Sequence, residues 1–296
     1  MQAVVVTRFG GPEVLSLTQV ERPSPISTEV LVRVIAAGVN PVDCKTRRGE
    51  GVAKWVGAPP FVPGWDVAGV VEATGYGVTR FKVGDTVYGM PRFPRQAGAY
   101  AEYVTAPSHQ FAAIPTNMNP IEAAALPLAA LTAWQCLVDV AQLGAGQKVL
   151  VHGASGGVGH LAVQIAMSRG ASVIATGGRN DREALSARNV DVALDLAGSD
   201  TGALLETLRD DGLLLAVASG ATDEVIADAA RRGIRVEQPL VEPDGRDLEG
   251  ISKLVESGKL KVNVEDVMPL RQAARAHERI EQGGRKGKLV LEVVND

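Results

Sequence analysis

A cluster of glycines between residues 153 and 159 is the part of the sequence whose composition and spacing point most directly to chemistry. The segment GASGGVG follows the apolar run KVLV and precedes HLAVQIAMSRG, which we interpret as a helix that Gly170 ends. A strand that enters a helix through a tight glycine turn directs unpaired backbone N–H groups toward one point, at the positive end of the helix dipole. This point is suited to a pyrophosphate, so the segment predicts a dinucleotide site.

The small residues of this segment match the dinucleotide fingerprint at two of its three positions. Ala154 stands where the strict pattern has glycine, whereas Gly156 would let a phosphate approach the backbone and Gly159 would let the helix pack closely on the strand. A glycine-rich turn that binds no ligand is the alternative. The residues that we expect to bind the pyrophosphate are Ala154, Ser155, Gly156, Gly157, Val158 and Gly159.

The end of the second strand, at Thr176, is followed by an arginine and not by a carboxylate. A free ribose 2′-hydroxyl usually meets Asp or Glu about 20 residues after the glycines, but here no carboxylate occurs before Asp181. The planar, permanently charged guanidinium of Arg179 is suited to a phosphate, and Gly177 and Gly178 leave room for it. We therefore predict NADPH over NADH, with Thr176, Gly177, Gly178 and Arg179 as the residues that bind its adenine ribose and 2′-phosphate. The alternative is a solvated Arg179, with Asp181 turned toward the ribose.

The chain divides into two parts with different sequence patterns. Up to about residue 116, short β-type runs separated by Gly and Pro predict a compact β-barrel or sandwich. The alanine-rich segment 121–140 looks helical, and strands and helices then alternate, which implies βαβ units and a parallel sheet. The elements expected after it are residues 148–151, 157–169, 172–176, 192–194, 213–217, 234–237 and 248–257, then an amphipathic segment at 271–281 and a strand at 287–294.

Composition excludes several classes of protein. A net charge of −4 provides no global field that would attract nucleic acid or an acidic membrane. The longest uncharged window, 149–168, is interrupted by glycines and two histidines, so we expect no membrane span. Cys44 and Cys136 are too few for a disulfide framework or a four-cysteine zinc site, which favours a reducing, cytoplasmic compartment.

Several blocks, in their order along nearly the whole chain, resemble the medium-chain dehydrogenase/reductase superfamily and, within it, the zinc-free quinone oxidoreductase (zeta-crystallin-like) branch. These blocks are VLVRVIAAGVNPVDCKTRRG, PPFVPGWDVAGVV, FKVGDTVYGM, GAYAEYV, AAALPLAALTAW, VLVHGASGGVG, GLLLAVASG and AHERIEQGGRKGKLVL. The resemblance implies an α/β protein with two domains. A GroES-like β-barrel catalytic domain would comprise 1–116 and be completed by 263–296, and a doubly wound Rossmann domain would comprise 117–262.

The resemblance also bears on zinc. Alcohol dehydrogenases of the superfamily hold a catalytic zinc through an early cysteine and a Gly-His-Glu motif, and the corresponding positions here are Asn40 and Gly64-Trp65-Asp66. Neither an amide nor an indole supplies the thiolate or imidazole that zinc prefers. We therefore expect no metal, and we expect Cys44 and Cys136 to be ordinary buried or half-buried thiols.

By resemblance, the reaction would be hydride transfer from NADPH to a quinone or an α,β-unsaturated carbonyl compound. Asn40 would lie beside the nicotinamide ribose or carboxamide, Thr132 near the same ring, and Lys288 and Ser219 within reach of the cofactor. Each of the first three has a structural alternative. Asn40 could cap a turn before Pro41, Thr132 could bond back to its own helix, and Lys288 could be a strand-edge charge.

One departure from the family concerns the sheet. Asp191 lies only 15 positions after Thr176, which leaves room for a single helix at 181–188 where the family inserts a further strand and helix. We therefore expect the Rossmann sheet to lack a strand on its adenine side.

Two other functions stay open at this point: an NADPH-binding sensor or structural protein without turnover, and a relative of the zinc alcohol dehydrogenases. The resemblance further implies a homodimer formed through edge strands of the Rossmann sheets.

Overall fold

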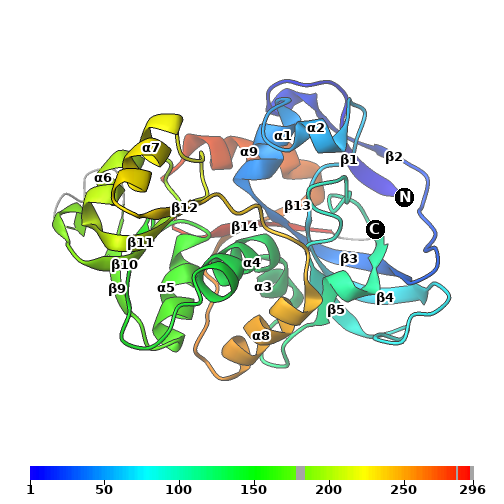
Figure 1. Ribbon diagram of the computed structural model, residues 1–296. Helices are drawn as coiled ribbons and strands as arrows, with labels where there is room; N and C mark the ends of the chain where they lie inside the picture. The colour runs from blue at the N-terminus through cyan, green and yellow to red at the C-terminus, as the bar shows by residue number, and fades with distance from the viewer. Residues whose placement is uncertain (178–183, 285, 294–296) are drawn as a thin grey trace. The chain divides into compact units, whose positions relative to one another are not determined.

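The computed structural model describes residues 1–177, 184–284 and 286–293, which form two compact units (Figure 1). The first unit comprises Met1–Leu131, Glu242–Glu256 and Val262–Asp296, and the second comprises Thr132–Val241 and Ser257–Lys261. The domain bounds expected from the family stay a prediction.

The first unit is rich in β-structure, as expected for the N-terminal part. In the part of this unit that the structure describes, seven strands form one sheet in the order β13-β14-β3-β4-β5-β7, with β6 paired to β3, and β1 and β2 form a separate antiparallel pair. Its strands are β1 (Gln2–Val6), β2 (Leu15–Gln19), β3 (Glu29–Val39), β4 (Asp66–Thr74), β5 (Thr86–Gly89), β6 (Tyr103–Pro107), β7 (Phe111–Ala113), β13 (Val264–Pro269) and β14 (Lys288–Glu292).

Strand β3 organises this sheet. Its sequence EVLVRVIAAGV is almost continuously apolar and almost wholly buried, which is typical of a strand covered on both faces. Register shifts between Leu31 and Val32 and between Val34 and Ala36 bend its pairing with β4. Strand β4 pairs with it from Val30 to Gly38, whereas β6 pairs with residues 29–33 and β14 with residues 36–39.

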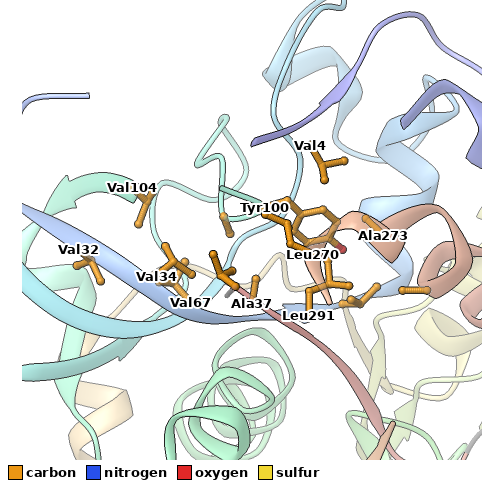
Figure 2. Close-up of a cluster of buried hydrophobic side chains, with 14 of the residues drawn as sticks. Val4, Val32, Val34, Ala37, Val67, Tyr100, Val104, Leu270, Ala273 and Leu291 are labelled. Atoms are coloured by element: carbon orange, nitrogen blue, oxygen red, sulfur yellow. The ribbon is translucent and has the colours of Figure 1, made fainter. Parts of the chain in front are cut away.

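The core of the first unit lies around this strand. Figure 2 shows Val32, Val34 and Ala37 of β3 in one apolar cluster with Tyr100 and Leu291. Burial of such side chains contributes about 25 cal/mol for each Å² of apolar surface removed from water. Residues distant in sequence are thereby fixed around the end of β3, where Asn40 follows.

The helices of the first unit connect and cover these strands. Asn119 accepts a hydrogen bond from the N–H of Glu122 at the start of α3, and the Glu122 carboxylate accepts from the N–H of Asn119, so this helix begins with a capping box. The helical elements are η1 (Pro12–Val14), α1 (Pro41–Arg47), α2 (Ala53–Val56), η2 (Ser108–Gln110), α3 (Pro120–Ala124), α8 (Gly245–Glu256), η5 (Leu270–Gln272) and α9 (Ala273–Gln282), with α4 (Pro127–Trp134) extending into the second unit.

Within its described residues, the second unit contains a parallel five-stranded sheet in the order β12-β11-β10-β8-β9. This confirms the predicted doubly wound sheet. Its elements are the π-helix η3 (Gln135–Val140), β8 (Lys148–His152), α5 (Gly159–Ser168), β9 (Ser172–Thr176), η4 (Ala184–Ser186), β10 (Val190–Asp195), α6 (Thr201–Thr207), β11 (Leu208–Ala216), α7 (Asp223–Arg231) and β12 (Arg235–Glu237). One apolar cluster joins Leu150 and Leu214 of the sheet to Leu204 of α6 and Ala229 of α7.

The strand order defines where a ligand would bind. From β8 the chain passes to β9 on one side, and it later returns to β10 on the other side of β8. Such a reversal opens a crevice at the carboxyl ends of the two central strands. Strand β9 is the edge of the described sheet, as the short segment before Asp191 predicts. The α-helix expected at 181–188 is wrong for the described residues 184–188, which contain only the 3₁₀ turn η4.

Candidate cofactor and active site

The glycine turn between β8 and α5 has the geometry of an anion-binding site, which we call the anion seat. Gly153 has a φ of +87°, which favours glycine. A Cβ on Gly159 would lie 2.6 Å from the Cα of Ala154 and closer still to the carbonyl oxygen of Gly153, so only glycine allows α5 to begin this close to the turn. Within the part of the chain that the structure describes, the N–H groups of Gly157, Val158 and Gly159 have no hydrogen-bond acceptor.

The turn after β10 lies beside this seat at the same edge of the sheet. A Cβ on Gly153 would be 3.3 Å from the backbone nitrogen of Ala197. Asp195, the last residue of β10, is buried and accepts the N–H groups of Ala197 at 3.1 Å and Gly198 at 2.9 Å, and its second oxygen accepts the hydroxyl of Thr201 at 2.8 Å. The turn is therefore held by its own carboxylate.

Ser219 follows β11 at this edge as well. Its side chain occupies the space that a side chain on Gly198 would need. The structure thus brings Ser219 together with the turn after β10, whereas sequence alone placed it only by resemblance. The carboxyl ends of β8, β10 and β11 contribute adjoining turns, which is where doubly wound sheets bind their ligands.

The end of β9 is tied to the glycine turn. The buried hydroxyl of Thr176 lies 2.8 Å from Nδ1 of His152 and accepts the N–H of Gly153 at 3.3 Å, and the hydroxyl of Ser155 donates to the carbonyl of Gly177 at 2.9 Å. The hydroxyl of Thr176 is thus engaged inside the unit. Gly178 and Arg179, expected at the adenine ribose, lie outside the described residues.

These features fit a dinucleotide. The turn offers backbone donors at the positive end of a ten-residue helix, and it contains no side chain beyond Ala154, Ser155 and Val158 that would block a phosphate. The unit therefore has the donor set of an NAD(P)(H) site.

In the first unit, Asn40 lies at the centre of a buried polar group. It follows β3 and precedes α1, and its side chain is 1% exposed. Its Nδ2 donates to Oδ2 of Asp66 at 2.8 Å, its Oδ1 accepts from the ammonium of Lys288, and its backbone N–H donates to Oδ2 of Asp43 at 2.7 Å. The amide therefore does more than cap a turn.

Strand pairing produces this group. Gly38 of β3 lies opposite Asp66 of β4, and Val39 lies opposite Leu289 of β14. The end of β3 is therefore flanked by the first residues of β4 and β14, which are Asp66 and Lys288. Strand β14 lies between β13 and β3, so the interpretation of Lys288 as a strand-edge charge is wrong.

Asp66 is fully buried, and burial raises its pKa while Lys288, Asn40 and the N–H of Leu128 lower it. Its Oδ1 accepts the N–H of Leu128 at 2.7 Å, in the first turn of α4, and its Oδ2 lies 3.6 Å from the Lys288 nitrogen. A buried carboxylate needs such partners because an isolated charge is costly in an apolar environment.

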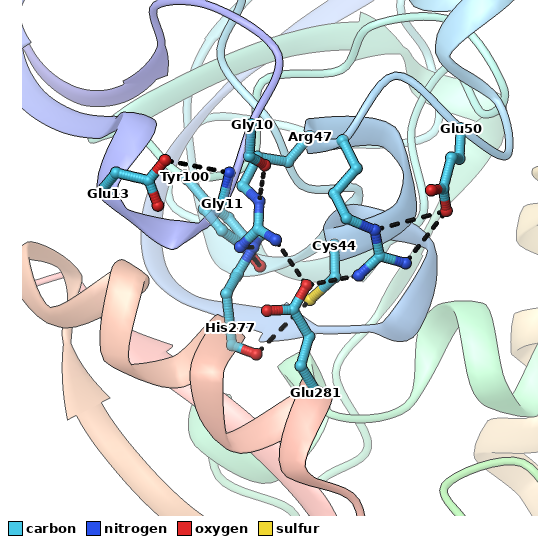
Figure 3. Close-up of polar contacts among 10 residues, drawn as sticks. Gly10, Gly11, Glu13, Cys44, Arg47, Glu50, Tyr100, His277 and Glu281 are labelled. Atoms are coloured by element: carbon cyan, nitrogen blue, oxygen red, sulfur yellow. Dashed lines mark hydrogen bonds and ion pairs between the residues drawn. The ribbon is translucent and has the colours of Figure 1, made fainter.

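A second buried network lies next to Asn40. Asp43 accepts the hydroxyl of Tyr100 at 2.9 Å, and that hydroxyl lies 3.2 Å from Nε2 of His277. Figure 3 shows Arg47 between the His277 ring and the carboxylate of Glu281. Burial raises the pKa of Asp43 to about 7, and burial followed by the charge of Arg47 lowers the pKa of His277 to about 3.

Thr132 lies in α4 and is buried, with an exposed fraction of 6%. The helix continues directly into the π-helix η3, and π-helical turns occur frequently at functional sites. Thr132 groups with the second unit and Asn40 with the first, so the structure places each only within its own unit.

The positions that correspond to zinc ligands have other roles here. Trp65 is buried, donates its indole N–H to the carbonyl of Arg95 at 2.7 Å and packs edge-on against Phe93. Cys44 and Cys136 are free and buried, and burial raises the pKa of each thiol to about 12. Among the described residues, no group of three or more His, Cys, Asp or Glu side chains could hold a metal ion.

Sequence reasoning missed the network of Asp43, Tyr100 and His277 and the partners of Asp66. A signal was present for two of them. Asp66 is the single charge within the apolar run VPGWDVAGVV, so it needed a buried partner. Asp43 lies three positions after Asn40 at the start of a helix, a spacing at which a carboxylate reaches back to a backbone N–H. Nothing local marked His277.

Comparison with known proteins agrees with this geometry. A model of the alcohol dehydrogenase GroES-like domain matches residues 27–116, and a model of zinc-binding dehydrogenases matches residues 168–291. The quinone oxidoreductase of Pongo abelii is 33% identical over 325 aligned positions, covering 98% of this chain and 97% of that protein. The NADPH-dependent alkenal/one oxidoreductase, chloroplastic, of Arabidopsis thaliana is 34% identical, covering 98% and 79%.

A solved structure shows the same similarity. The quinone oxidoreductase from Coxiella burnetii superimposes with a TM-score of 0.90 at 32% identity and covers 99% of both chains. The two-unit fold and the dinucleotide seat define this chain as a medium-chain dehydrogenase/reductase, and hence as an oxidoreductase. Within that superfamily it belongs to the quinone oxidoreductase branch. Among the helices that the structure describes, none has the length and apolarity needed to cross a membrane.

Proposed function

We propose that this protein is a zinc-independent reductase that transfers hydride from NADPH to a quinone or an α,β-unsaturated carbonyl compound. The glycine turn between β8 and α5 carries this proposal, because the N–H groups of residues 157–159 have no acceptor among the described residues and the shape of the turn admits a phosphate. The acceptor class is supported by the names of the relatives, a quinone oxidoreductase and an alkenal/one oxidoreductase.

The nicotinamide of NADPH supplies the hydride, and the chain binds and orients it. Residues 154–159 hold the pyrophosphate, with Ser219 at the adjoining turn. Asn40, Thr132 and Lys288 are proposed to contact the nicotinamide half and to hold it in register with the acceptor. Quinones and enones need no strong acid to accept hydride, because conjugation spreads the developing negative charge. Orientation and exclusion of water are then the main contributions of the protein.

The preference for NADPH over NADH is part of the proposal. It is supported by the absence of a carboxylate between Thr176 and Asp181 in the sequence and by Arg179, whose guanidinium suits a 2′-phosphate. Thr176 and Gly177 are the last described residues before this loop. A Cβ on Gly177 would meet no described atom within 4 Å, so there is open space beside it. The Arabidopsis relative is named as NADPH-dependent.

Independence from zinc is supported by the chemistry of the donor set. The indole N–H of Trp65 is committed to the carbonyl of Arg95, and the amide of Asn40 is committed to Asp66 and Lys288. Neither group is a zinc ligand of the usual kinds. A homodimer and a cytoplasmic location are proposed with it, the latter supported by the two free cysteines.

The test is turnover with defined cofactors and acceptors. Purified protein, dialysed against a chelator and assayed for metal content, is mixed with NADPH or NADH and either a small o-quinone such as phenanthrenequinone or a simple enone. We expect loss of NADPH absorbance with at least one acceptor, slower loss with NADH, and no stoichiometric metal. NADPH binding without turnover on any acceptor would instead indicate a sensor or structural role. Turnover that requires zinc would overturn the metal-independent mechanism.

A further inference from the structure

Asp66 connects three parts of the first unit. Its Oδ1 accepts the N–H of Leu128 at 2.7 Å, and its Oδ2 accepts Nδ2 of Asn40 at 2.8 Å and lies 3.6 Å from the ammonium of Lys288. All of these side chains lie within the unit interior, since Asn40, Asp66 and Lys288 are at most 2% exposed. The carboxylate therefore uses both oxygens on donors that come from different elements.

The two charges determine how the Asn40 amide is oriented. A carboxylate only accepts hydrogen bonds and an ammonium only donates them. The NH₂ group of Asn40 must therefore face Asp66, and its carbonyl oxygen must face Lys288. Reversing the amide would place two donors and two acceptors against each other. This leaves one Nδ2 hydrogen of Asn40 uncommitted within the described residues, whereas the oxygen also faces the backbone N–H of Asp43 in the capping box of α1.

We propose that Asp66 is a positioning residue, which fixes the orientation of the Asn40 amide and anchors the first turn of α4, the helix that carries Thr132. The inference rests on the proposed function, in which Asn40 and Thr132 contact the nicotinamide half of the cofactor. Asp66 acts through these residues and has no contact with a substrate of its own. It therefore decides which donor and which acceptor Asn40 presents.

No neutral amide can replace this carboxylate. An Asp66→Asn side chain has one accepting oxygen and one NH₂ group. If the oxygen accepts from Leu128, the NH₂ group faces the NH₂ group of Asn40. If the oxygen accepts from Asn40, the NH₂ group faces the N–H of Leu128. Either orientation of the Asp66→Asn side chain therefore places two donors against each other. Reversing the Asn40 amide does not relieve this, because its NH₂ group would then face the ammonium of Lys288, which is also a donor.

Exchanging the residues at positions 40 and 66 restores the hydrogen bonds but leaves no amide at position 40. In the double variant Asn40→Asp/Asp66→Asn, the new carboxylate at position 40 accepts from Lys288 and from the NH₂ group at position 66. The oxygen at position 66 then accepts from Leu128. The total charge and these hydrogen bonds are retained, and the carboxylate at position 40 replaces Asp66 as the partner of the Lys288 charge. Position 40 then presents only acceptors to the cofactor.

The experiment compares wild type, Asp66→Asn and the exchanged double variant. The measured quantities are kcat and KM for the quinone, the dissociation constant of NADPH and Tm. Asp66→Asn is expected to lower Tm and to reduce kcat/KM by roughly tenfold or more, with the loss mainly in kcat. The exchanged variant is expected to regain Tm while kcat/KM stays low. Asp85→Asn, which alters a carboxylate that accepts the N–H of Lys82 in an exposed turn, is the matched control and should behave as wild type.

Three results would overturn the proposal. Asp66→Asn could keep the wild-type kcat/KM, which would show that Asn40 needs no such orientation. The exchanged variant could regain activity together with Tm, in which case Asp66 supports only the fold. Failure of the exchanged variant to regain Tm would refute the hydrogen-bond arrangement itself.

A readout without turnover separates this proposal from the proposed function. The side-chain amide of Asn40 is followed by NMR on protein labelled at asparagine and assigned by its loss in Asn40→Asp. A buried, doubly bonded amide should exchange slowly with water and shift in Asp66→Asn but not in Asp85→Asn. An unchanged Asn40 signal in Asp66→Asn contradicts the positioning role, whether or not the wild type reduces quinones.

Discussion

Gly159 packs against the carbonyl oxygen of Gly153 at a distance that leaves no space for a Cβ atom. This contact joins the first residue of α5 to the residue that follows β8, so the turn between them is forced to be tight. The tight turn is what directs the N–H groups of residues 157–159 toward one point. Close packing and anion binding are thus the same feature of the backbone.

Gly159→Ala tests this relationship. The added methyl group would lie 2.6 Å from the Cα of Ala154, so α5 must move away from the turn. We expect the dissociation constant of NADPH to rise by roughly tenfold or more and Tm to fall, as for other overpacked sites. Isothermal titration calorimetry and thermal unfolding measure the two effects.

The matched control for that variant is Gly202→Ala in α6. A Cβ there meets no described atom within 4 Å, and alanine favours a helix over glycine. This change should leave NADPH binding unaltered and stabilise the unit by about 0.5–1 kcal/mol. Equal loss of binding in both variants would refute the steric argument.

Asp195 should hold the turn after β10 through its hydrogen bonds to Ala197, Gly198 and Thr201. Asp195→Ala leaves these donors without an acceptor, and we expect a loss of about 2–4 kcal/mol in the free energy of unfolding together with weaker NADPH binding. Asp195→Asn keeps one accepting oxygen for the two N–H groups, and the hydroxyl of Thr201 can rotate to accept. Urea denaturation should therefore show a much smaller decrease in the free energy of unfolding for Asp195→Asn than for Asp195→Ala. Equal decreases in the two variants would contradict this account.

His277 should make stability depend on pH. Its pKa falls from the ordinary 6.5 to about 3 in the folded protein because of burial and, second, the charge of Arg47. Between these values the unfolded chain binds a proton that the folded chain does not, so this residue lowers stability as the pH decreases from about 6.5 toward 3. Asp43, whose pKa rises from 3.8 to about 7 through burial, acts in the opposite direction, since the folded chain binds the extra proton there.

Replacement of His277 isolates its contribution. Urea denaturation gives the free energy of unfolding of His277→Gln and of wild type at each pH. The variant should gain stability relative to wild type as the pH is lowered from 7 to about 4.5. The test is the change of this stability difference with pH, because loss of the contact with Tyr100 alters the difference equally at pH 7 and at about pH 4.5. A difference that does not vary with pH would show that His277 titrates in the native protein as it does in the unfolded chain.

The two thiols should be unreactive in the native protein. Cys44 and Cys136 are buried and free, and burial raises the pKa of each to about 12, so the thiolate is scarce at neutral pH. A disulfide reagent such as Ellman's should titrate no thiol rapidly before denaturation and two thiols per chain after it. Rapid labelling of either cysteine with loss of activity would indicate an accessible thiol near the site.

Local features of the site could be predicted from the sequence. The glycines at 153–159, the apolar run before them and the helix after them are neighbours in the chain, and the conformational freedom of glycine and the spacing of apolar residues act over short distances. The same holds for the position of β9 at the edge of the described sheet, because a segment of this length has no room for a further strand and helix. The 3₁₀ turn η4 departs from the expected helix, and its residues pack against β9 and α6 where tertiary contacts outweigh helix propensity.

The partners of Asn40 could not be predicted in this way. Asp66 lies 26 residues and Lys288 lies 248 residues from Asn40 in the chain, and only the register of β3 with β4 and β14 brings them together. Sequence alone therefore determined that the chain contains a dinucleotide turn and a candidate amide at position 40. The tertiary structure decided which charges surround that amide, because the pairing of distant strands is set by the whole core and not by any one segment.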